Sequence, residues 1–288
     1  MISTGTSNTV QHYQRIVLTL NLGGDNNQNN IIEHTVHFAG DFNSSLTCLC
    51  VRDSDLLDYA GLPFAREFSL HGTSTHSLNA DDVRSDMDRR ASNIRHVLED
   101  LTASQQQQNS FLVVDGRVDE KVVETAEEDD LIVMAVTPPI QRNIEVAYEK
   151  ICTIIANRPY DLLLVPRTHQ PHAGAVAVLA DKAIPSERAL QLAFHSAQRR
   201  HVGVVFFTAS DTELLKAIKK RCDSILAAQI GPAPVLSIHS LNQCLSYPWR
   251  CRPCSFMVLE LTEALPPLNI IDRALSALHC PILLLRQK

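Results

Sequence analysis

The sequence lacks the features that would place it in a membrane, outside the cell or on nucleic acid. No apolar run approaches the roughly 20 residues that a membrane-spanning helix needs. The first 14 residues lack the basic and then apolar pattern of a secretory signal. The formal net charge of −6 provides no general attraction to nucleic acid or to anionic lipid. We therefore expect a cytoplasmic protein with no nucleic-acid partner and no membrane partner.

Catalytic signatures are missing as well. The sequence contains no GxSxG nucleophile motif and no HExxH metal motif, and its twelve histidines are scattered. Most of its eight cysteines lie in or beside apolar segments, where cysteine usually behaves as a small hydrophobic residue. In a reducing compartment such cysteines are mostly free thiols. We predict that the protein is not an enzyme and has no catalytic residue and no metal site.

One cysteine pair, Cys251 and Cys254, has a spacing that suggests thiol chemistry. A reactive pair of this kind stands at a helix N-terminus, where the helix dipole lowers the thiol pKa. This pair instead precedes an expected strand at Phe256–Leu261. A zinc site would need two further ligands, and the candidates lack paired spacing: Cys244, His239, His279 and Cys280. Redox sensitivity through Cys251 and Cys254 stays open as an alternative hypothesis, ahead of redox catalysis and zinc binding.

Short β-branched runs alternate with helical patterns along the whole chain. Ile16–Leu20 is apolar on both faces, as a strand covered by helices on both sides would be. The expected strands are residues 16–20, 46–51, 111–115, 131–136, 162–165, 176–179, 202–208, 235–238, 256–261 and 282–285. The expected helices are residues 29–38, 81–104, 119–128, 143–156, 186–201, 211–229 and 268–278, with a helical turn at 241–246. This alternation predicts β-α-β crossovers and parallel sheets with helices on both faces.

The second half of the chain repeats the order of elements in the first. The polar segment Thr168–Gly174 has the composition of a linker. The first expected strands of the halves start 160 residues apart and the third strands 124 apart, and most of this difference falls within Arg52–Ala80. Duplication followed by one insertion explains this pattern, and two independent domains with the same order of elements are the alternative. We predict an α/β protein with two tandem five-stranded parallel-sheet domains, at residues 1–167 and 174–288.

These features resemble the universal stress protein family over essentially the whole chain. The resemblance rests on the order of elements, on the long helix after the second strand, and on four segments: IVLTLN, AVAVLAD followed by Pro185-Ser186-Glu187, DLLLVPR and PILLLR. It implies the adenine-nucleotide α-hydrolase-like type of α/β domain. It also implies that the two halves pair through their last strands, as two single-domain members do, and it leaves a further homodimer open.

The resemblance places the family's nucleotide site at the ends of strands one and four. In the nucleotide-binding branch an acidic residue ends strand one, a position that falls on Asn21 in the first half and Asp181 in the second. A glycine-rich loop follows strand four in that branch, because glycine lets backbone N–H groups point at phosphates. Here that loop contains Pro138-Pro139 or Pro266-Pro267 and no glycine, and proline has no N–H to donate.

The resemblance therefore implies degenerate nucleotide sites and no cofactor. The leading hypothesis is a non-enzymatic stress-response or regulatory protein that acts by binding protein partners on exposed faces, including the Arg52–Ala80 segment. The alternative is that one half binds ATP or AMP, through Asp181 or, as a weakened counterpart, Asn21. We interpret Gly23-Gly24, which follows strand one, as a flexible turn.

Overall fold

The computed structural model describes most of the chain outside the termini and several connections. The described residues are 13–24, 28–68, 75–136, 160–167, 174–180, 183–208, 212–228, 233–240, 253–261, 271, 275 and 279–286. Within them, no helix is both long and apolar enough to cross a membrane. The predicted helix at 143–156, the turn at 241–246, most of the predicted linker and most of the predicted helix at 268–278 lie outside the described residues.

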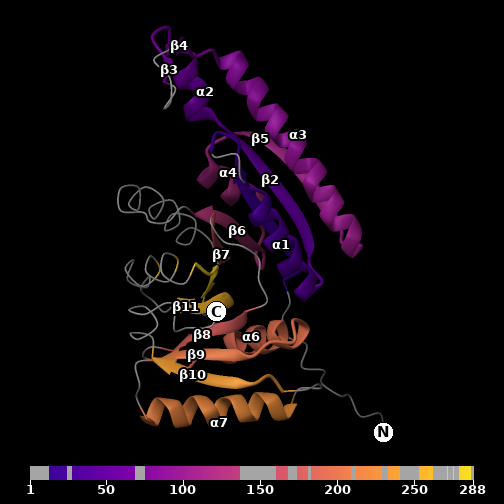
Figure 1. Ribbon diagram of the computed structural model, residues 1–288, viewed down its shortest axis with the longest axis vertical. Helices are drawn as coiled ribbons and strands as arrows, with labels where there is room; N and C mark the ends of the chain where they lie inside the picture. The colour runs from indigo at the N-terminus through magenta and orange to yellow at the C-terminus, as the bar shows by residue number, and fades with distance from the viewer. Residues whose placement is uncertain are drawn as a thin grey trace.

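The described residues form a ten-stranded sheet that runs through the molecule, with five strands from each half of the chain (Figure 1). The first half contributes β1 (Arg15–Asn21), β2 (Ser45–Asp53), β5 (Asn109–Gly116), β6 (Leu131–Val136) and β7 (Asp161–Pro166). The second half contributes β8 (Ala175–Ala180), β9 (Val204–Thr208), β10 (Leu236–Ser240), β11 (Cys254–Leu261) and β12 (Ile282–Arg286).

The strand order across the sheet is β5-β2-β1-β6-β7-β12-β11-β8-β9-β10. Neighbouring strands are parallel within each half, and β7 and β12 pair antiparallel, with Leu163 opposite Leu283. Both halves thus have the same internal order, counted from the edge as third, second, first, fourth and fifth strand. The predicted α/β class, the two five-stranded parallel sheets and the pairing of the last strands are confirmed. The domain boundaries at 167 and 174 stay a prediction.

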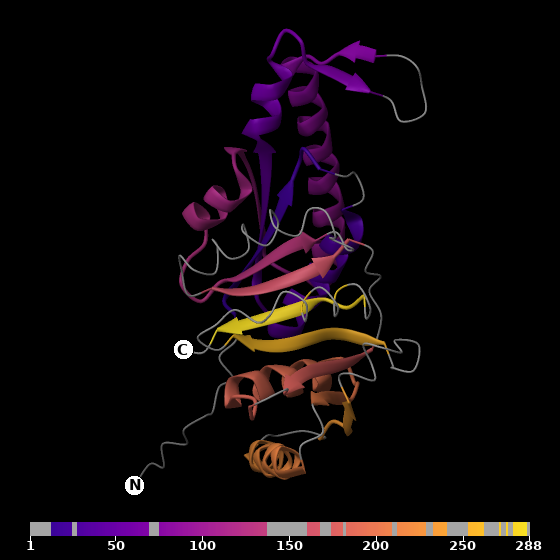
Figure 2. The same ribbon diagram turned by 90° about the vertical axis from the view of Figure 1, so that its left-hand side faces the viewer.

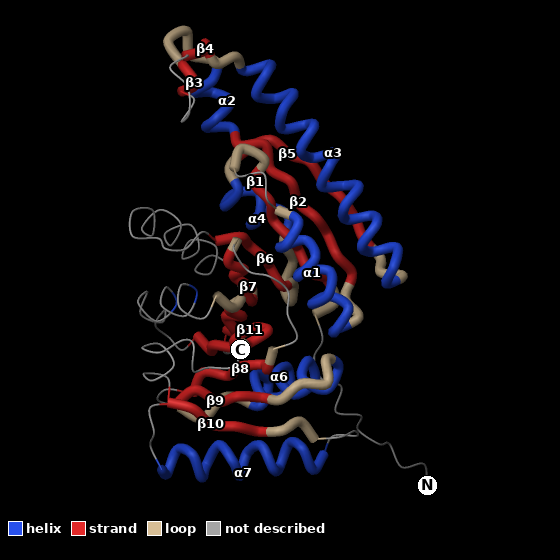
Figure 3. Tube along the Cα trace, viewed as in Figure 1, coloured by secondary structure: helices blue, strands red, loops and turns tan. Residues whose placement is uncertain are grey.

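Helices cover both faces of this sheet (Figure 3). The helices that pack on one face are α1 (Asn29–Phe42), α2 (Ser54–Ala60), α3 (Ala80–Gln105), α6 (Glu187–Arg199) and α7 (Thr212–Ala228). The other face is covered by α4 (Val118–Thr125) and by Ile271 and Leu275. Successive residues of a strand therefore enter different cores: Ile16 and Leu18 face the first core, and Val17 faces the second. This explains why β1 is apolar at consecutive positions.

Side-chain signals set the ends of several helices. Asn79 begins α3 and Ser186 begins α6, and each side chain accepts a hydrogen bond from a backbone N–H of the first turn. The α1 helix continues four residues beyond its predicted end, to Phe42, because Ala39 and Phe42 still pack into the core. The α4 helix ends at Thr125, three residues before its predicted end.

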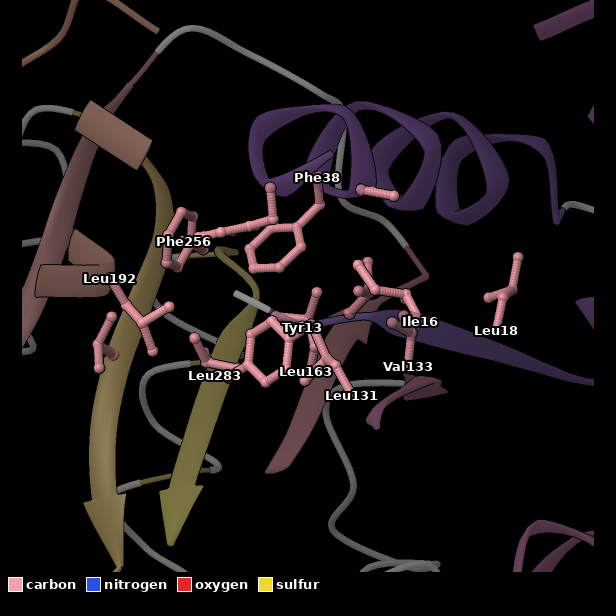
Figure 4. Close-up of a cluster of buried hydrophobic side chains, with 14 of the residues drawn as sticks. Tyr13, Ile16, Leu18, Phe38, Leu131, Val133, Leu163, Leu192, Phe256 and Leu283 are labelled. Atoms are coloured by element: carbon pink, nitrogen blue, oxygen red, sulfur yellow. The ribbon is translucent and has the colours of Figure 1, made fainter. Parts of the chain in front are cut away.

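The apolar core continues from one half into the other (Figure 4). The Phe38 ring of α1 packs edge-on against the Phe256 ring of β11, with ring centroids 5.2 Å apart. Leu163 and Leu283 lie opposite each other on the two central strands. A single cluster of buried side chains therefore spans the junction between the halves, in addition to the backbone pairing of β7 with β12.

A buried carboxylate joins the halves at the start of β7. Asp161, 3% exposed, accepts a hydrogen bond from Tyr13 Oη at 2.8 Å and another from the backbone N–H of Arg286 at 3.0 Å. The Arg188 guanidinium of α6 forms an ion pair with the same carboxylate. Burial, together with the charge of Asp161, raises the pKa of the Tyr13 hydroxyl well above its ordinary value. The Asp161 carboxylate is thus neutralised and hydrogen-bonded by groups from both halves.

A second polar contact joins α1 to α6. The Asp41 carboxylate accepts hydrogen bonds from Ser196 Oγ at 3.0 Å and Arg200 Nε at 2.5 Å, and the Asp41 carbonyl lies 2.8 Å from His195 Nε2. The His195 ring stacks on Phe42 with centroids 5.4 Å apart. Backbone pairing, a shared core and two polar contacts therefore hold the two halves together.

The Arg52–Ala80 insertion forms structure of its own. It contains α2 and a short antiparallel pair of strands, β3 (Arg66–Phe68) and β4 (Thr75–Ser77), which form no part of the large sheet. Figures 1 and 2 show α2, β3 and β4 beside the first turns of α3, at the end of the molecule farthest from α7. The β3–β4 pair has no counterpart among the predicted elements.

Candidate functional site at the carboxyl edge of the first half

Asn21 lies where a parallel sheet of this order normally binds its ligands. Strand β1 lies between β2 and β6, so the chain leaves its carboxyl end at the point where the strand order reverses. Asn21 Nδ2 donates to Asp53 Oδ2 at 2.9 Å, and Asn21 Oδ1 accepts from the Gly23 N–H at 2.8 Å. The Asn21 carbonyl accepts from Gln28 Nε2 at 3.1 Å. Neighbouring groups of the protein thus engage both ends of the Asn21 amide.

The two glycines after β1 sit in a closely packed turn. A Cβ at Gly23 would lie 3.0 Å from Leu56 Cδ2, and one at Gly24 would lie 3.2 Å from Arg167 Nη2. A side chain at either position would therefore be crowded by Leu56 or by the end of Arg167, and these neighbours would have to shift by a few tenths of an ångström. The Gly23 N–H is bonded to Asn21, and the Gly24 N–H to the Asn21 carbonyl at 3.3 Å. The structure confirms the expected turn at Gly23-Gly24 and shows that it is hydrogen-bonded to Asn21; its flexibility stays a prediction.

Arg90 of α3 fastens the same turn from the side. Its Nη1 donates to the carbonyl of Leu22 at 2.9 Å and to that of Gly24 at 2.7 Å. In the sequence, the basic pair Arg89-Arg90 is typical of an ordinary solvated face; for Arg90 this interpretation is wrong, because its guanidinium is half-buried against the turn. The helical spacing could have indicated that Arg90 faces the protein, because Arg90 lies three residues after buried Met87 and one before buried Ala91.

Two arginines and two aspartates form an ionic cluster at the ends of β2 and β5. Arg52 donates to Asp115 Oδ1 at 2.5 Å and to Asp88 Oδ1 at 2.8 Å, and Arg84 Nη1 lies 3.1 Å from Asp115 Oδ2. The hydrogen bond from Arg52 is the largest cause that lowers the pKa of Asp115 below its ordinary value. The carboxyl edge of the first half is therefore rich in charge, but its charges are largely paired with one another.

The neighbouring carboxylate of Asp53 favours an amide over a second carboxylate at position 21. An aspartate there would place a second carboxylate against Asp53, where the two oxygens could share no hydrogen bond once both are ionised. We predict that Asn21→Asp lowers the free energy of unfolding by about 1–3 kcal/mol at pH 7. Repulsion raises the folded-state pKa of the pair, so the loss grows as the pH rises above about 4 and shrinks below it. Urea unfolding at several pH values measures this dependence.

The double variant Asn21→Asp/Asp53→Asn is the matched control. It restores one amide and one carboxylate, and asparagine also serves as an N-cap for α2, which Asp53 now caps through Asp55 N and Leu56 N. Its stability should return to within about 1 kcal/mol of the wild type. A single variant as stable as the wild type at pH 7 would show that the Asn21–Asp53 contact does not decide the residue at this position.

The remaining predicted nucleotide-site residues cannot be placed against this geometry. Asp181, the Pro138-Pro139 pair and the Pro266-Pro267 pair all lie outside the described residues. The binding role of Asp181 and the degeneracy of the loops after strand four accordingly stay predictions. Of the two predicted cofactor positions, the structure describes Asn21 alone.

Cys254, one member of the predicted redox pair, begins β11 and is 3% exposed. Burial raises the pKa of its thiol to about 11, which disfavours the thiolate. Cys251 lies outside the described residues, so the pair itself stays a prediction. The five described cysteines are all buried: Cys48, Cys50, Cys222, Cys254 and Cys280. The described residues contain no group of three or more side chains arranged to hold a metal ion.

We predict that Cys254 of the folded protein reacts with iodoacetamide at pH 7 at least about tenfold more slowly than a free cysteine, because its thiol is buried and protonated. Peptide mass spectrometry after timed labelling measures this rate, and the same protein in urea provides the reactive reference. Labelling of Cys254 as fast in the folded as in the unfolded protein would contradict the prediction and favour the redox alternative.

Two polar cavities lie at the opposite, amino edge of the first half. One of about 680 Å³ is lined by the C-terminal residues of α1 and by Gln105–Gln108 at the end of α3, and one of about 630 Å³ is lined by Tyr13, His195 and Arg199. Both are also lined by Asp41, which contacts α6. They lie beside the junction between the halves, away from Asn21.

Comparison with protein-family models finds no match, and none of the curated proteins matches the sequence. Solved structures do share the fold. A universal stress protein from Archaeoglobus fulgidus DSM 4304 superposes with a TM-score of 0.61 at 10% identity, over 96% of this chain and 98% of that one. A putative universal stress protein from Pseudomonas aeruginosa UCBPP-PA14 gives 0.52 at 13% identity, over 97% and 95%.

A third similar structure is the cytoplasmic domain of a prokaryotic cation chloride cotransporter. Its TM-score is 0.55 at 13% identity, over 94% of this chain and 95% of that one. All three likenesses extend over nearly the full length of both proteins and include both halves of the sheet. The chain has the universal stress protein fold.

Proposed function

We propose that this chain is a non-enzymatic, tandem universal stress protein that acts in stress response or regulation by binding protein partners. The observation that supports this most is that the polar groups at the carboxyl end of β1 in the first half are hydrogen-bonded within the protein. The amide of Asn21 is engaged by Asp53 and Gly23, and the carbonyls of Leu22 and Gly24 are engaged by Arg90. Groups that could form hydrogen bonds to a nucleotide thus already form them within the protein.

The insertion supplies a surface suited to a partner. Tyr59, Leu62 and Phe64 are large apolar side chains that are 49%, 40% and 72% exposed. Aromatic side chains of this kind are enriched among residues that dominate protein–protein binding energies. A structure of this fold and length also occurs as the cytoplasmic domain of a larger transport protein, which supports a role as a binding module.

Adenine-nucleotide binding by one half is the second candidate. Arg167 and Arg90 both approach the turn at Gly24, and their positive charge would favour an anionic ligand at the carboxyl edge. Asp181 of the second half is the other residue that this candidate uses.

Calorimetric titration of the purified protein with Mg-ATP and AMP separates the two candidates. We expect no saturable heat, and a change in melting temperature of less than about 1 °C with either nucleotide in excess, because a ligand that binds tightly stabilises the folded state by mass action. Saturable binding with a rise of several degrees would contradict the degenerate-site proposal. Loss of that binding in Asp181→Ala, or in Arg90→Ala, would then assign it to one half.

A further inference from the structure

The outer end of the insertion presents an apolar surface on a hydrogen-bonded turn. We call this surface the tip and define it by Tyr59, Leu62 and Phe64. The Leu62 N–H donates to the Tyr59 carbonyl at 3.1 Å, and the Ala65 N–H donates to the Leu62 carbonyl at 3.0 Å. Ala65 itself is buried. The backbone that carries the tip is thus ordered before any partner arrives, which reduces the entropy cost of binding.

Acidic side chains lie on the two helices next to the tip. Four exposed aspartates lie on α2 and on the first turn of α3, and in the described part of the chain none is within ion-pair distance of a cation: Asp55, Asp58, Asp81 and Asp82. Two arginines of α3 form ion pairs with other acidic residues, Arg84 with Asp115 and Arg89 with Asp86. Arg66 is the exposed base that remains close in sequence. The end of the molecule that carries the tip therefore combines exposed apolar side chains with unpaired negative charge on the adjacent helices.

The opposite end of the molecule has the complementary character. Helix α7 and strand β10 form this end (Figures 1 and 2), and it exposes Val235 (78%) and Ile238 (47%). The described residues of α7 include four bases, Lys216, Lys219, Lys220 and Arg221, and two acids, Glu213 and Asp223. Lys219 and Lys220 are exposed and lie in no ion pair among the described residues, whereas Lys216 pairs with Glu213 on the same helix.

We propose that the tip of one copy of this chain docks onto the α7–β10 end of a second copy. Charge complementarity and the placement of exposed apolar groups carry the inference, because five of the seven large apolar side chains exposed in the described residues lie at these two ends. Complementary potentials speed and orient association, and apolar groups at the centre of the contact supply binding energy.

The two surfaces differ and lie at opposite ends of the long axis, so the contact is heterologous. Heterologous contacts produce an open chain of copies or a ring, and not a two-fold dimer. The inference rests on the proposed role of the insertion in protein binding, and it names a second copy of this chain as the partner.

Sedimentation velocity of the full chain over a range of concentrations tests the contact. We expect the weight-average mass to rise with concentration, and the rise to weaken at least about tenfold in apparent affinity between about 0.05 and 0.5 M salt, because ionic strength screens exposed charges. Phe64→Ser, which alters the tip, and Lys219→Glu/Lys220→Glu, which alters the other end, should each stay monomeric. Ile184→Ser, at an exposed apolar position 45% accessible in the second half, is the matched control and should associate like the wild type.

Mixing the two altered proteins distinguishes this contact from other forms of association. Each retains one intact surface, so an equimolar mixture should form a one-to-one complex and grow no further. A wild type that is monomeric at all concentrations, a Phe64→Ser protein that associates like the wild type, or a mixture that stays monomeric would overturn the proposal. Circular dichroism of each variant confirms that it is folded. If these experiments show no self-association and the titrations show no nucleotide binding, the proposed function stands and only the second copy is removed as the partner.

Discussion

Replacing Asp161 by asparagine is expected to lower the free energy of unfolding by about 3–5 kcal/mol, the usual cost of leaving one member of a buried ion pair uncompensated. The carboxylate is 3% exposed and interacts with Arg188, Tyr13 and the N–H of Arg286. Asparagine keeps the size of the side chain but removes the charge that offsets the partly buried guanidinium. Urea unfolding followed by circular dichroism at pH 7 measures the difference.

Glu213→Gln provides the control for the charge change alone. Glu213 pairs with Lys216 on the surface of α7, where both side chains are more than two-thirds exposed. Exposed pairs at this helical spacing contribute about 0.5 kcal/mol or less, so this variant should be nearly as stable as the wild type. An Asp161→Asn protein that loses less than about 1 kcal/mol would show that the polar contact at the junction is dispensable.

Shortening Phe38 to alanine is expected to lower the free energy of unfolding by about 3–5 kcal/mol, as large-to-small changes at buried aromatic positions do. The Phe38 ring is fully buried and contacts Phe256 of the other half (Figure 4). Its removal leaves a cavity inside the core that the two halves share. The variant should still unfold in a single transition, shifted to lower urea concentration, because the lost packing destabilises both halves at once.

Phe64→Ala is the matched change at an exposed phenylalanine, and it should alter the stability of dilute, monomeric protein by about 0.5 kcal/mol or less. Two separate unfolding steps, of which Phe38→Ala shifts only the earlier or only the later, would contradict a core shared between the halves. Equal stabilities of Phe38→Ala and wild type would do the same.

The sheet could be predicted from the sequence because its signals are local. Most of the strands are short apolar runs whose side chains enter two cores, and the connecting helices repeat their buried residues at helical spacing. The alternation of strands with helices, repeated in the same order in the second half, was enough to give the parallel topology. The pairing of β7 with β12 came from the family resemblance, since nothing local marks which edges meet.

The insertion was located by sequence but its structure was not predicted. β3 and β4 have three residues each, which is too short for an alternating pattern to stand out. The exposed side chains Tyr59, Leu62 and Phe64 read as ordinary apolar residues in the sequence, and only the fold shows that they face away from the core.

The candidate site was predicted in position and not in detail. Asn21 was identified as the end of strand one, but its partner Asp53 is 32 residues away along the chain. Arg90, which fastens the following turn, comes from α3, 66 residues beyond Gly24. Contacts of this kind depend on which strand ends lie side by side and on how helices pack on the sheet, and no local pattern in a single sequence encodes either.

The nucleotide content of the protein purified from cells tests the central claim most directly, since it needs no added ligand and no variant. The protein is denatured, and the released adenine nucleotides are separated by chromatography and counted against the number of chains. Because the polar groups at the carboxyl end of β1 are hydrogen-bonded to side chains of the protein itself, we expect only a trace of nucleotide. About one ATP or AMP per chain would contradict the account and make this protein a nucleotide binder.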